Sequence, residues 1–418
     1  MRRTLTLPLS VILAALMITL SMVGGARATA PARVDGDMLL LRAGANAGGD
    51  MVSLPGGGAA HHLPLGLLAS HGSVLYTASA AASGPSLFRA LDARSGRVLR
   101  SLVLPGAYST STGDYSATTL SYNGLWQALR ATTAPAGTTR AIVVNTATMK
   151  VAATLTLPGR FGLDAVDGQG AVLYLIERLA RPGDHPYRVR SYQIGQGMLD
   201  DQPVLDKSAP DPASATMSGV AWTRVWSPDG AWLYTLYIYT QPGGKAGAFV
   251  HALSVVNRIA HCIDLPDNGA AGADLAHYTL AVSADGATLY AVNPVLGRLR
   301  VVHGLPFGEI RKADLGQRAG SARRSLGGAV LSGDGRHLFV VTMRGVWTLD
   351  AATLALSAVH LPGVAVTSLA LNSTGRLLYA LEPEHNRGQA LDPATGRVIA
   401  TLPTASDAWA IAAIMDKR

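Results

Sequence analysis

The stretch "SPDGAWLYTLY", residues 227–237, decides the fold. It joins an Asp-Gly turn to a Leu-Tyr pair that opens an apolar and aromatic run. Glycine tolerates the positive φ that tight hairpin turns require, and such runs are typical of strands. Nearly the same phrase returns as "SADGATLYAVN" at 283–293 and "SGDGRHLFVVT" at 332–342. The phrase therefore predicts a hairpin that the chain builds several times.

The repeat extends along most of the sequence. Six copies have Leu three residues and Tyr or Phe four residues after the turn glycine: Gly72, Gly170, Gly230, Gly286, Gly335 and Gly375. Two weaker copies begin at Gly36 and Gly124. Successive glycines are 36, 52, 46, 60, 56, 49 and 40 residues apart, which is the period of a supersecondary unit stacked many times.

Each unit predicts four antiparallel strands, and long helical periodicity is absent. Four-stranded units that pack radially bury both of their faces, so we predict an all-β fold, a single β-propeller. The repeat count gives eight blades. Seven is the alternative, if the Gly124 unit or the split terminal unit is not a full blade. A lone strand at each end, near residue 36 and at 407–415, predicts closure of the ring by pairing of the N- and C-terminal strands.

The repeat residues resemble a known family. "SPDGAWLYT", "SADGATLYAVN" and "LDPATGRVIATL" look like the YVTN-type, WD40-like repeats of bacterial envelope propellers, which are related to quinoprotein-like propellers. The resemblance covers roughly residues 35–415 and implies the propeller fold. It implies little about activity, because such residues serve turns and blade packing. Related propellers carry out sugar-lactone hydrolysis or quinone-dependent oxidation, but we assign no residue of either activity to this chain.

The N-terminus has the features of a secretory signal peptide. Arg2 and Arg3 precede an apolar stretch, and "ARA" at 26–28 is a small-x-small cleavage signal. We predict a signal peptide at 1–28, a short linker at 29–34 and the propeller at 35–418. An uncleaved membrane anchor formed by residues 5–23 is the alternative. Either reading places the protein outside the cytoplasm, in the cell envelope or the medium.

Net charge and cysteine content limit the classes of partner and cofactor that we expect. Loss of Arg2, Arg3 and Arg27 takes the basic residues from 35 to 32 against 27 acidic ones, so the net charge falls from +8 to +5. Without a concentrated basic face we expect no nucleic acid partner. Cys262 is the only cysteine, which leaves no intrachain disulfide and no cysteine-built metal or haem attachment site. We expect a monomer without metal or cofactor, and membrane contact only through the N-terminal segment.

Longer polar loops are expected at one end of the channel. In a propeller, the residues before each first strand and the loops between second and third strands converge at the channel mouth. Candidate ligand-binding residues there are His185, Trp222, Arg224, His277, Glu384 and His385. No familiar catalytic motif accompanies them. We therefore expect a noncatalytic scaffold that binds a protein, glycan or small polar ligand. The alternative is an envelope enzyme, lactonase-like or quinoprotein-like, that uses the same funnel.

Overall fold

The computed structural model describes residues 37–43, 49–53, 59–69, 72–79, 84–110, 119–180, 185–205, 215–240, 244–265, 270–306, 308, 310–320, 328–405 and 408–415. The expected signal peptide and linker, residues 1–34, lie outside these ranges and stay predictions. None of the described helices is long and apolar enough to cross a membrane.

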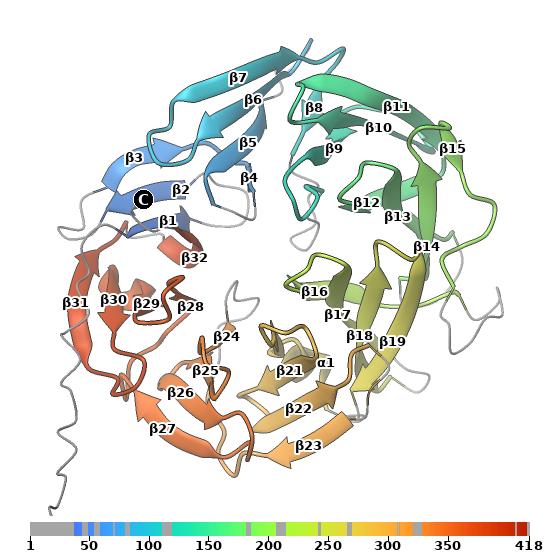
Figure 1. The fold of residues 1–418 in the computed structure, drawn as a ribbon. Helices are drawn as coiled ribbons and strands as arrows, with labels where there is room; N and C mark the ends of the chain where they lie inside the picture. The colour runs from blue at the N-terminus through green and yellow to red at the C-terminus, as the bar shows by residue number, and fades with distance from the viewer. Residues whose placement is uncertain are drawn as a thin grey trace, which may run out of the picture. The chain divides into compact units, whose positions relative to one another are not determined.

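Eight four-stranded antiparallel sheets form a ring, here called blades A to H (Figure 1). From the channel outward, blade A consists of β32 (Ala408–Met415), β1 (Met38–Ala43), β2 (Gly49–Ser53) and β3 (Ala59–Leu63). Blade B consists of β4 (Leu67–Leu68), β5 (Val74–Ser79), β6 (Leu87–Asp92) and β7 (Val98–Val103). Blade C consists of β8 (Tyr108–Ser109), β9 (Trp126–Ala131), β10 (Thr138–Asn145) and β11 (Lys150–Pro158).

The next three blades follow in chain order, each with its first strand innermost. Blade D consists of β12 (Arg160–Val166), β13 (Val172–Arg178), β14 (Tyr187–Gln193) and β15 (Met198–Leu199). Blade E consists of β16 (Val220–Trp226), β17 (Trp232–Thr240), β18 (Ala246–Ser254) and β19 (Ile259–Leu265). After the short helix α1 (Gly272–Leu275), blade F consists of β20 (Thr279–Val282), β21 (Thr288–Asn293), β22 (Arg298–His303) and β23 (Ile310–Asp314).

Two further blades complete the ring. Blade G consists of β24 (Ala329–Leu331), β25 (His337–Thr342), β26 (Gly345–Asp350) and β27 (Leu356–His360). Blade H consists of β28 (Ser368–Leu371), β29 (Leu378–Glu382), β30 (Arg387–Leu391) and β31 (Val398–Pro403), with the 3-10 helix η1 (Pro383–His385) between its second and third strands. The prediction of an all-β propeller with eight blades is confirmed.

The repeated Ser-x-Asp-Gly phrase is a hydrogen-bonded turn between first and second strands. The Ser227 hydroxyl donates to Asp229 Oδ1 and accepts from the Trp232 backbone N–H at 2.9 Å. The same bonds recur at Ser283 and Ser332. The turn glycine has a φ between +67° and +72° in every described copy: Gly72, Gly124, Gly170, Gly230, Gly286, Gly335 and Gly375. The phrase recurs because each blade needs this one geometry.

The weak copy at Gly124 is a full blade. Ser121 keeps the serine of the phrase and Asn123 replaces its aspartate, and the two make the equivalent bonds to each other and to the backbone N–H of Trp126 and Leu125. This unit forms blade C, which excludes the seven-blade alternative.

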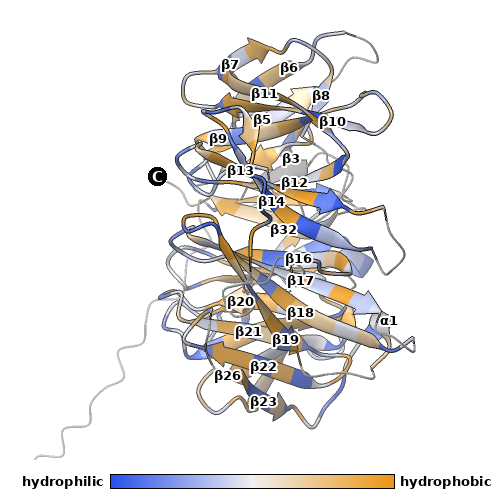
Figure 2. Cartoon of the chain, turned by 90° about the vertical axis from the view of Figure 1, so that its right-hand side faces the viewer, coloured by the Kyte–Doolittle hydropathy of each residue, from blue (hydrophilic) through white to orange (hydrophobic). Residues whose placement is uncertain are grey.

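The repeat tyrosine joins neighbouring blades. Tyr174 of blade D donates to the Val255 carbonyl of blade E at 3.0 Å, and Tyr379 of blade H donates to Asp37 Oδ2 at 2.7 Å. Apolar side chains fill the spaces between blades, and Figure 2 shows hydrophobic residues along the strands. The core is thus a series of interblade layers.

The ring closes as the lone terminal strands predict. In blade A, β32 pairs with β1 from Met38↔Met415 to Ala43↔Ala408. The Ile411 backbone N–H donates to Ser368 Oγ of blade H at 3.0 Å, which ties the closing strand to its other neighbour. The innermost strand of blade A therefore comes from the far end of the chain.

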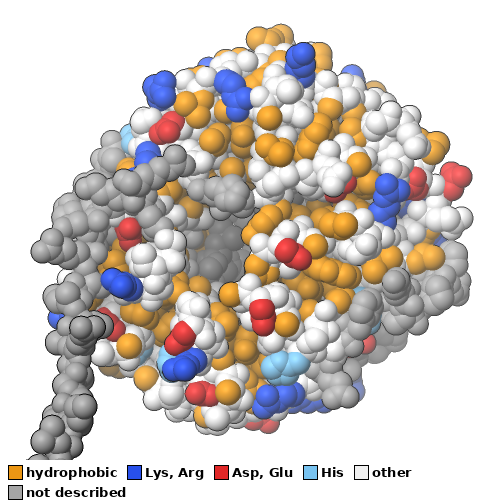
Figure 3. Space-filling model, in the orientation of Figure 1, with side chains coloured by type: hydrophobic (Ala, Val, Ile, Leu, Met, Phe, Trp, Pro, Cys, Tyr) orange, Lys and Arg blue, Asp and Glu red, His pale blue; other side chains and the backbone are white. Residues whose placement is uncertain are grey.

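The two faces of the ring differ in their connections. One face, called the turn face, carries the Asp-Gly turns, and the other, called the loop face, carries α1 and the loops between second and third strands. Figures 1 and 2 together place α1 on the far side of the view in Figure 1. Figure 3 therefore shows the turn face, with a central hollow, hydrophobic side chains around it and charged side chains mostly farther out.

Candidate functional site

A buried ion pair joins the innermost strands of blades D and E. Arg224 NH2 of β16 lies 2.9 Å from Asp164 Oδ1 of β12, and Arg224 NH1 donates to the Asp164 carbonyl at 3.3 Å. The two side chains are only 9% and 5% exposed. Because both strands are the innermost of their blades, this pair lies beside the channel (Figure 1).

The two strands that carry Asp164 and Arg224 each have a β-bulge close to this pair. The pairing of β12 with β13 shifts between Leu163 and Ala165, so Asp164 is the extra residue of a β-bulge. The pairing of β16 with β17 shifts between Ala221 and Thr223, so Trp222 is the extra residue there. Bulges redirect side chains and are common beside functional sites.

Aromatic rings form a layer next to the ion pair. The rings of Tyr187 and Tyr237 stack with centroids 4.9 Å apart, and Phe249 stacks on Tyr237 at 5.3 Å. Burial, with a contribution from the Asp164 charge, raises the pKa of Tyr187 and of Tyr237 well above the ordinary tyrosine value. Both phenols therefore keep their protons at neutral pH and act as hydrogen-bond donors.

Arg224 Nε and the Tyr187 hydroxyl are two of several buried polar atoms in the described part of the chain, Arg190 Nε among them, that make no hydrogen bond of normal geometry. The Tyr187 hydroxyl has the Tyr237 hydroxyl as its neighbour. A buried donor without a partner costs about 1–3 kcal/mol, so native proteins rarely keep one without a reason. An acceptor atom of a ligand or a water would relieve this cost.

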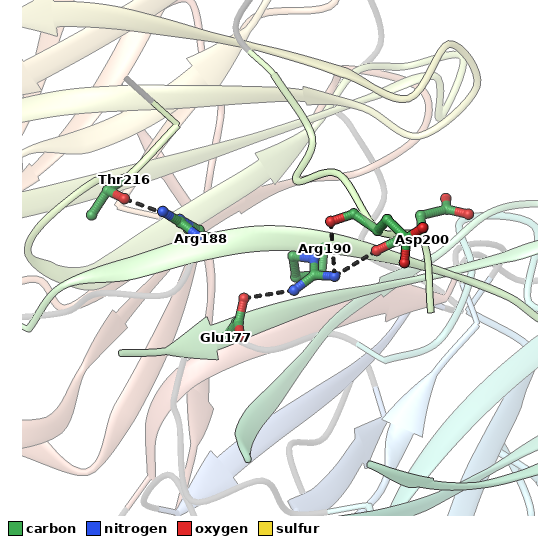
Figure 4. A network of polar contacts seen from close by, with 6 residues as sticks. Glu177, Arg188, Arg190, Asp200 and Thr216 are labelled. Atoms are coloured by element: carbon green, nitrogen blue, oxygen red, sulfur yellow. Dashed lines mark hydrogen bonds and ion pairs between the residues drawn. The ribbon is translucent and has the colours of Figure 1, made fainter. Parts of the chain in front are cut away.

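The third strand of blade D carries two further arginines, which alternate with Tyr187 and Val189 and so lie on the opposite face of the blade, toward blade C. Arg190 donates to Glu177 Oε2 at 2.8 Å and also to the Asp200 carbonyl, and Arg188 donates to Thr216 Oγ1 at 3.1 Å (Figure 4). Arg178 places its guanidinium carbon 5.7 Å from the centre of the Tyr187 ring. Of these three arginines, only Arg178 shares the face of blade D that carries Tyr187.

The predicted mouth residues fall into two groups. His185, Trp222, Arg224 and His277 belong to the consecutive blades D, E and F or to the segments that lead into them. Trp222 packs against the apolar cluster that includes Ala276 and Tyr278, the neighbours of His277. His185 is exposed, with a φ of 50°. Their role in ligand binding stays a prediction.

Glu384 and His385 lie elsewhere, in η1 of blade H. Both are exposed, and His385 Nδ1 is 3.4 Å from Glu382 Oε2. The fully buried Glu382 carboxylate also accepts from Arg387 Nε at 2.7 Å and from Gln389. The polar side chains of this loop therefore contact the Glu382 carboxylate of their own hairpin. Blade H lies four blades from blade D in the ring of eight.

Sequence reasoning missed Asp164 and Tyr187 as neighbours of Arg224. The available signal was a single charged residue within the otherwise apolar run "LDAV" at 163–166. Within the described ranges, no three His, Cys, Asp or Glu side chains gather in an arrangement that would hold a metal ion.

Comparison with known proteins supports the fold. No family model matches the chain, and no curated protein matches it. Among solved structures, dihydro-heme d1 dehydrogenase NirN matches with a TM-score of 0.53 and 11% identity, over 90% of this chain and 75% of that one. The periplasmic gluconolactonase PpgL of Pseudomonas aeruginosa matches with a TM-score of 0.43 and 18% identity, over 79% and 97%. A putative 6-phosphogluconolactonase from Bacteroides uniformis gives 0.42 and 16%, over 82% and 98%.

The comparison corrects the expectation of a noncatalytic scaffold. That expectation rested on clear repeats without a familiar catalytic motif. NirN, which matches with a TM-score of 0.53, is named as a dehydrogenase, so a propeller fold is no reason to exclude catalysis. The expectation of a noncatalytic scaffold is therefore wrong as the main reading. The YVTN repeat type itself is matched by no family model.

Proposed function

We propose that this chain is an enzyme that hydrolyses a small lactone beside the channel, between blades D and E. The observation that carries this proposal is the buried Asp164–Arg224 pair with two unused donors, Arg224 Nε and the Tyr187 hydroxyl. A carboxylate next to hydrogen-bond donors in a site of low water content suits acyl chemistry. The N-terminal signal features support an activity outside the cytoplasm.

Asp164, Arg224 and Tyr187 have different roles in the proposed hydrolysis. Asp164 accepts a proton from a water molecule as that water attacks the lactone carbonyl carbon. Arg224 and Tyr187 donate hydrogen bonds to the carbonyl oxygen while it carries negative charge. The ring C–O bond then breaks, and the leaving alkoxide takes the proton from Asp164. Water and lactone give one hydroxy acid, and the enzyme returns to its starting state.

Tyr187→Phe is the sharpest test, because it removes a buried hydroxyl that makes no hydrogen bond of normal geometry within the described structure. The melting temperature should stay the same or rise. With δ-gluconolactone as the probe and acid release followed by a pH indicator, kcat should fall about tenfold to a hundredfold, since one lost oxyanion donor costs about 10²–10³ in favourable cases. Asp164→Asn should abolish turnover.

The matched control is Glu177→Gln, which also breaks an ion pair of blade D but leaves the Asp164–Arg224 pair intact. It should retain turnover. A Tyr187→Phe variant and a folded Asp164→Asn variant that both turn over at the wild-type rate would overturn the proposal. So would wild-type protein that hydrolyses neither δ-gluconolactone, which is uncharged, nor a lactone that carries a carboxylate or phosphate group.

A further inference from the structure

The turn of blade C contacts the turn of blade E, although blade D lies between the two blades in the ring (Figure 1). Tyr122 stands between Ser121 and Asn123, at the second position of the repeated phrase. Its hydroxyl donates to the Pro228 carbonyl of blade E at 2.8 Å. Tyr122 therefore bridges the turn-face end of blade D.

The second position of the phrase makes a shorter contact in two other blades. Pro228 of blade E lies against Gly286 of blade F, where its Cδ is 3.6 Å from the place that a Cβ would occupy. The Cα of Gly333 in blade G is 3.7 Å from the corresponding place at Gly375 of blade H. Both contacts join adjacent blades. Of these three turns, only that of blade C reaches the second blade along.

Glycines in blades D and E accommodate this bridge. Blade D has Gly168 at the second position of its turn, and the Asn123 amide donates to the Gly168 carbonyl at 2.6 Å. In blade E, a Cβ added at Gly230 would lie 2.3 Å from Tyr122 Cδ1. A side chain at Gly230 would displace the Tyr122 ring, so the contact between blades C and E depends on this glycine.

The Tyr122 ring lies at the turn-face end of the candidate site. It packs at a tilt on the Trp226 ring, with centroids 5.9 Å apart. Trp226 is the last residue of β16, two residues after Arg224, and it packs against the layer between blades D and E that includes Tyr237. Asp164 likewise lies two residues before the end of β12. The Tyr122–Trp226 contact therefore covers the Asp164–Arg224 pair from the turn face.

The contact is weak enough to open. Tyr122 is half-buried and Pro228 is exposed, so their hydrogen bond is open to water. One such hydrogen bond and one ring pair each contribute little, so a minor open state is populated at equilibrium. Figure 3 shows a central hollow on the turn face, through which a molecule can approach this contact.

We infer that Tyr122 is a gate residue that admits small molecules to the Asp164–Arg224 pair from the turn face, and admits larger ones only when its contact with Trp226 opens. The inference deepens the proposed function and rests on it for the identity of the reaction. The gate itself stands on the contacts of Tyr122. Its effect is on access and on the size of the substrate, and it takes no part in bond breaking.

The first experiment measures access without turnover. Thr223 is half-buried beside Arg224, and Cys262 is the only native cysteine, so Thr223→Cys in a Cys262→Ser background reports access to this strand. Its rate of reaction is measured with methyl methanethiosulfonate and with the bulky fluorescein-5-maleimide. The bulky reagent should react about twofold to tenfold faster after Tyr122→Phe, which removes the hydrogen bond, and about fivefold to a hundredfold faster after Tyr122→Ala, which also removes the ring pair. The small reagent should change less.

The matched control is Leu125→Ala, which removes an exposed apolar side chain from the same turn and leaves Tyr122 in place. It should label at the wild-type rate. Equal rates for the bulky reagent with Tyr122 and with Tyr122→Ala would overturn the gate, as would an equal increase for both reagents. A Tyr122→Ala protein without a cooperative melting transition would show a structural clasp and would also overturn the gate.

Kinetics then connect the gate to the reaction. The smaller probe is δ-gluconolactone, and the larger is the δ-lactone of lactobionic acid, which carries a second sugar ring. In Tyr122→Ala, the ratio of kcat/KM for the larger probe to that for the smaller should rise about tenfold. An unchanged ratio would overturn the role of Tyr122 in substrate size. Labelling that depends on Tyr122, in a wild-type protein that hydrolyses no lactone, would support the gate and overturn the proposed function.

Discussion

Blades D and H place a glutamate at the same point of the repeat, seven residues after the turn glycine, yet surround it differently. Glu382 of blade H is fully buried and is held by Arg387, Gln389 and His385 of its own hairpin. Glu177 of blade D is 25% exposed and bonds to Arg190, while further arginines stand nearby. A fully buried carboxylate with several partners in its own hairpin holds its loop firmly, whereas a pair that is partly open to solvent constrains its hairpin less. Equivalent positions of the repeat thus differ in how much they contribute to stability.

Blade H also borders the seam where the ring closes, and the largest expected effect lies there. A chain ending at residue 406 lacks β32, which pairs with β1 and contacts Ser368 of blade H. Since whole domains are stable by only about 5–15 kcal/mol, we expect insoluble protein or a thermal scan without a cooperative transition. A chain ending at Met415 is the control and should melt like wild type. A cooperative transition at the wild-type temperature in the shorter chain would contradict the closing role of β32.

A matched pair of substitutions compares the two glutamates directly. Glu382→Gln leaves Arg387 beside a neutral group in a site whose carboxylate had no access to water, so we expect a loss of about 2 kcal/mol or more in unfolding free energy. Glu177→Gln breaks a pair that is partly open to solvent, and the loss should stay below about 1 kcal/mol. Chemical denaturation measures both. Equal losses would show that the two carboxylates play the same part.

The smallest expected effect is on the pH dependence of stability, and it arises at the boundary between blades G and H. His360 of β27 is buried against Gly396 of blade H, and this burial lowers the pKa of His360 below its ordinary value of 6.5. Below pH 6.5 the unfolded chain binds the proton more readily than the folded one, so acidification destabilises the protein until the lower folded pKa is passed.

The variant His360→Gln tests this linkage. Its stability should fall less steeply than that of wild type between pH 7 and pH 5, as followed by denaturant titration at each pH. His62→Gln, at an exposed histidine, should keep the wild-type slope. The linkage would be refuted by parallel curves for wild type and His360→Gln.

The sequence predicts the fold well because the fold depends on local chemistry. A Ser-x-Asp-Gly turn satisfies its own hydrogen bonds within six residues, so each copy can be recognised without knowing the rest of the structure. The closing strand at 407–415 is also visible locally, as a strand that lacks a partner in its own unit.

The candidate site was only partly predictable, because its contacts are tertiary. Arg224 was found as a mouth residue, but its partner Asp164 is 60 residues away in sequence and belongs to another blade. The position of Asp164 also depends on a bulge that shifts the register of β12 against β13 by one residue. Glu384 and His385, chosen for their chemistry, lie on a hairpin whose polar groups serve Glu382.

The position of β32 also governs when the ring can form during synthesis. Of the described strands, the innermost strand of blade A is the last to be synthesised, although its partner β1 is the first. Blades B to H can each pair their strands as they emerge, since all four come from one continuous segment. Blade A must wait with three strands and an open inner edge until residue 415 has been made. A chain interrupted at any earlier point keeps that edge exposed, where proteases and chaperones can distinguish it from a finished molecule.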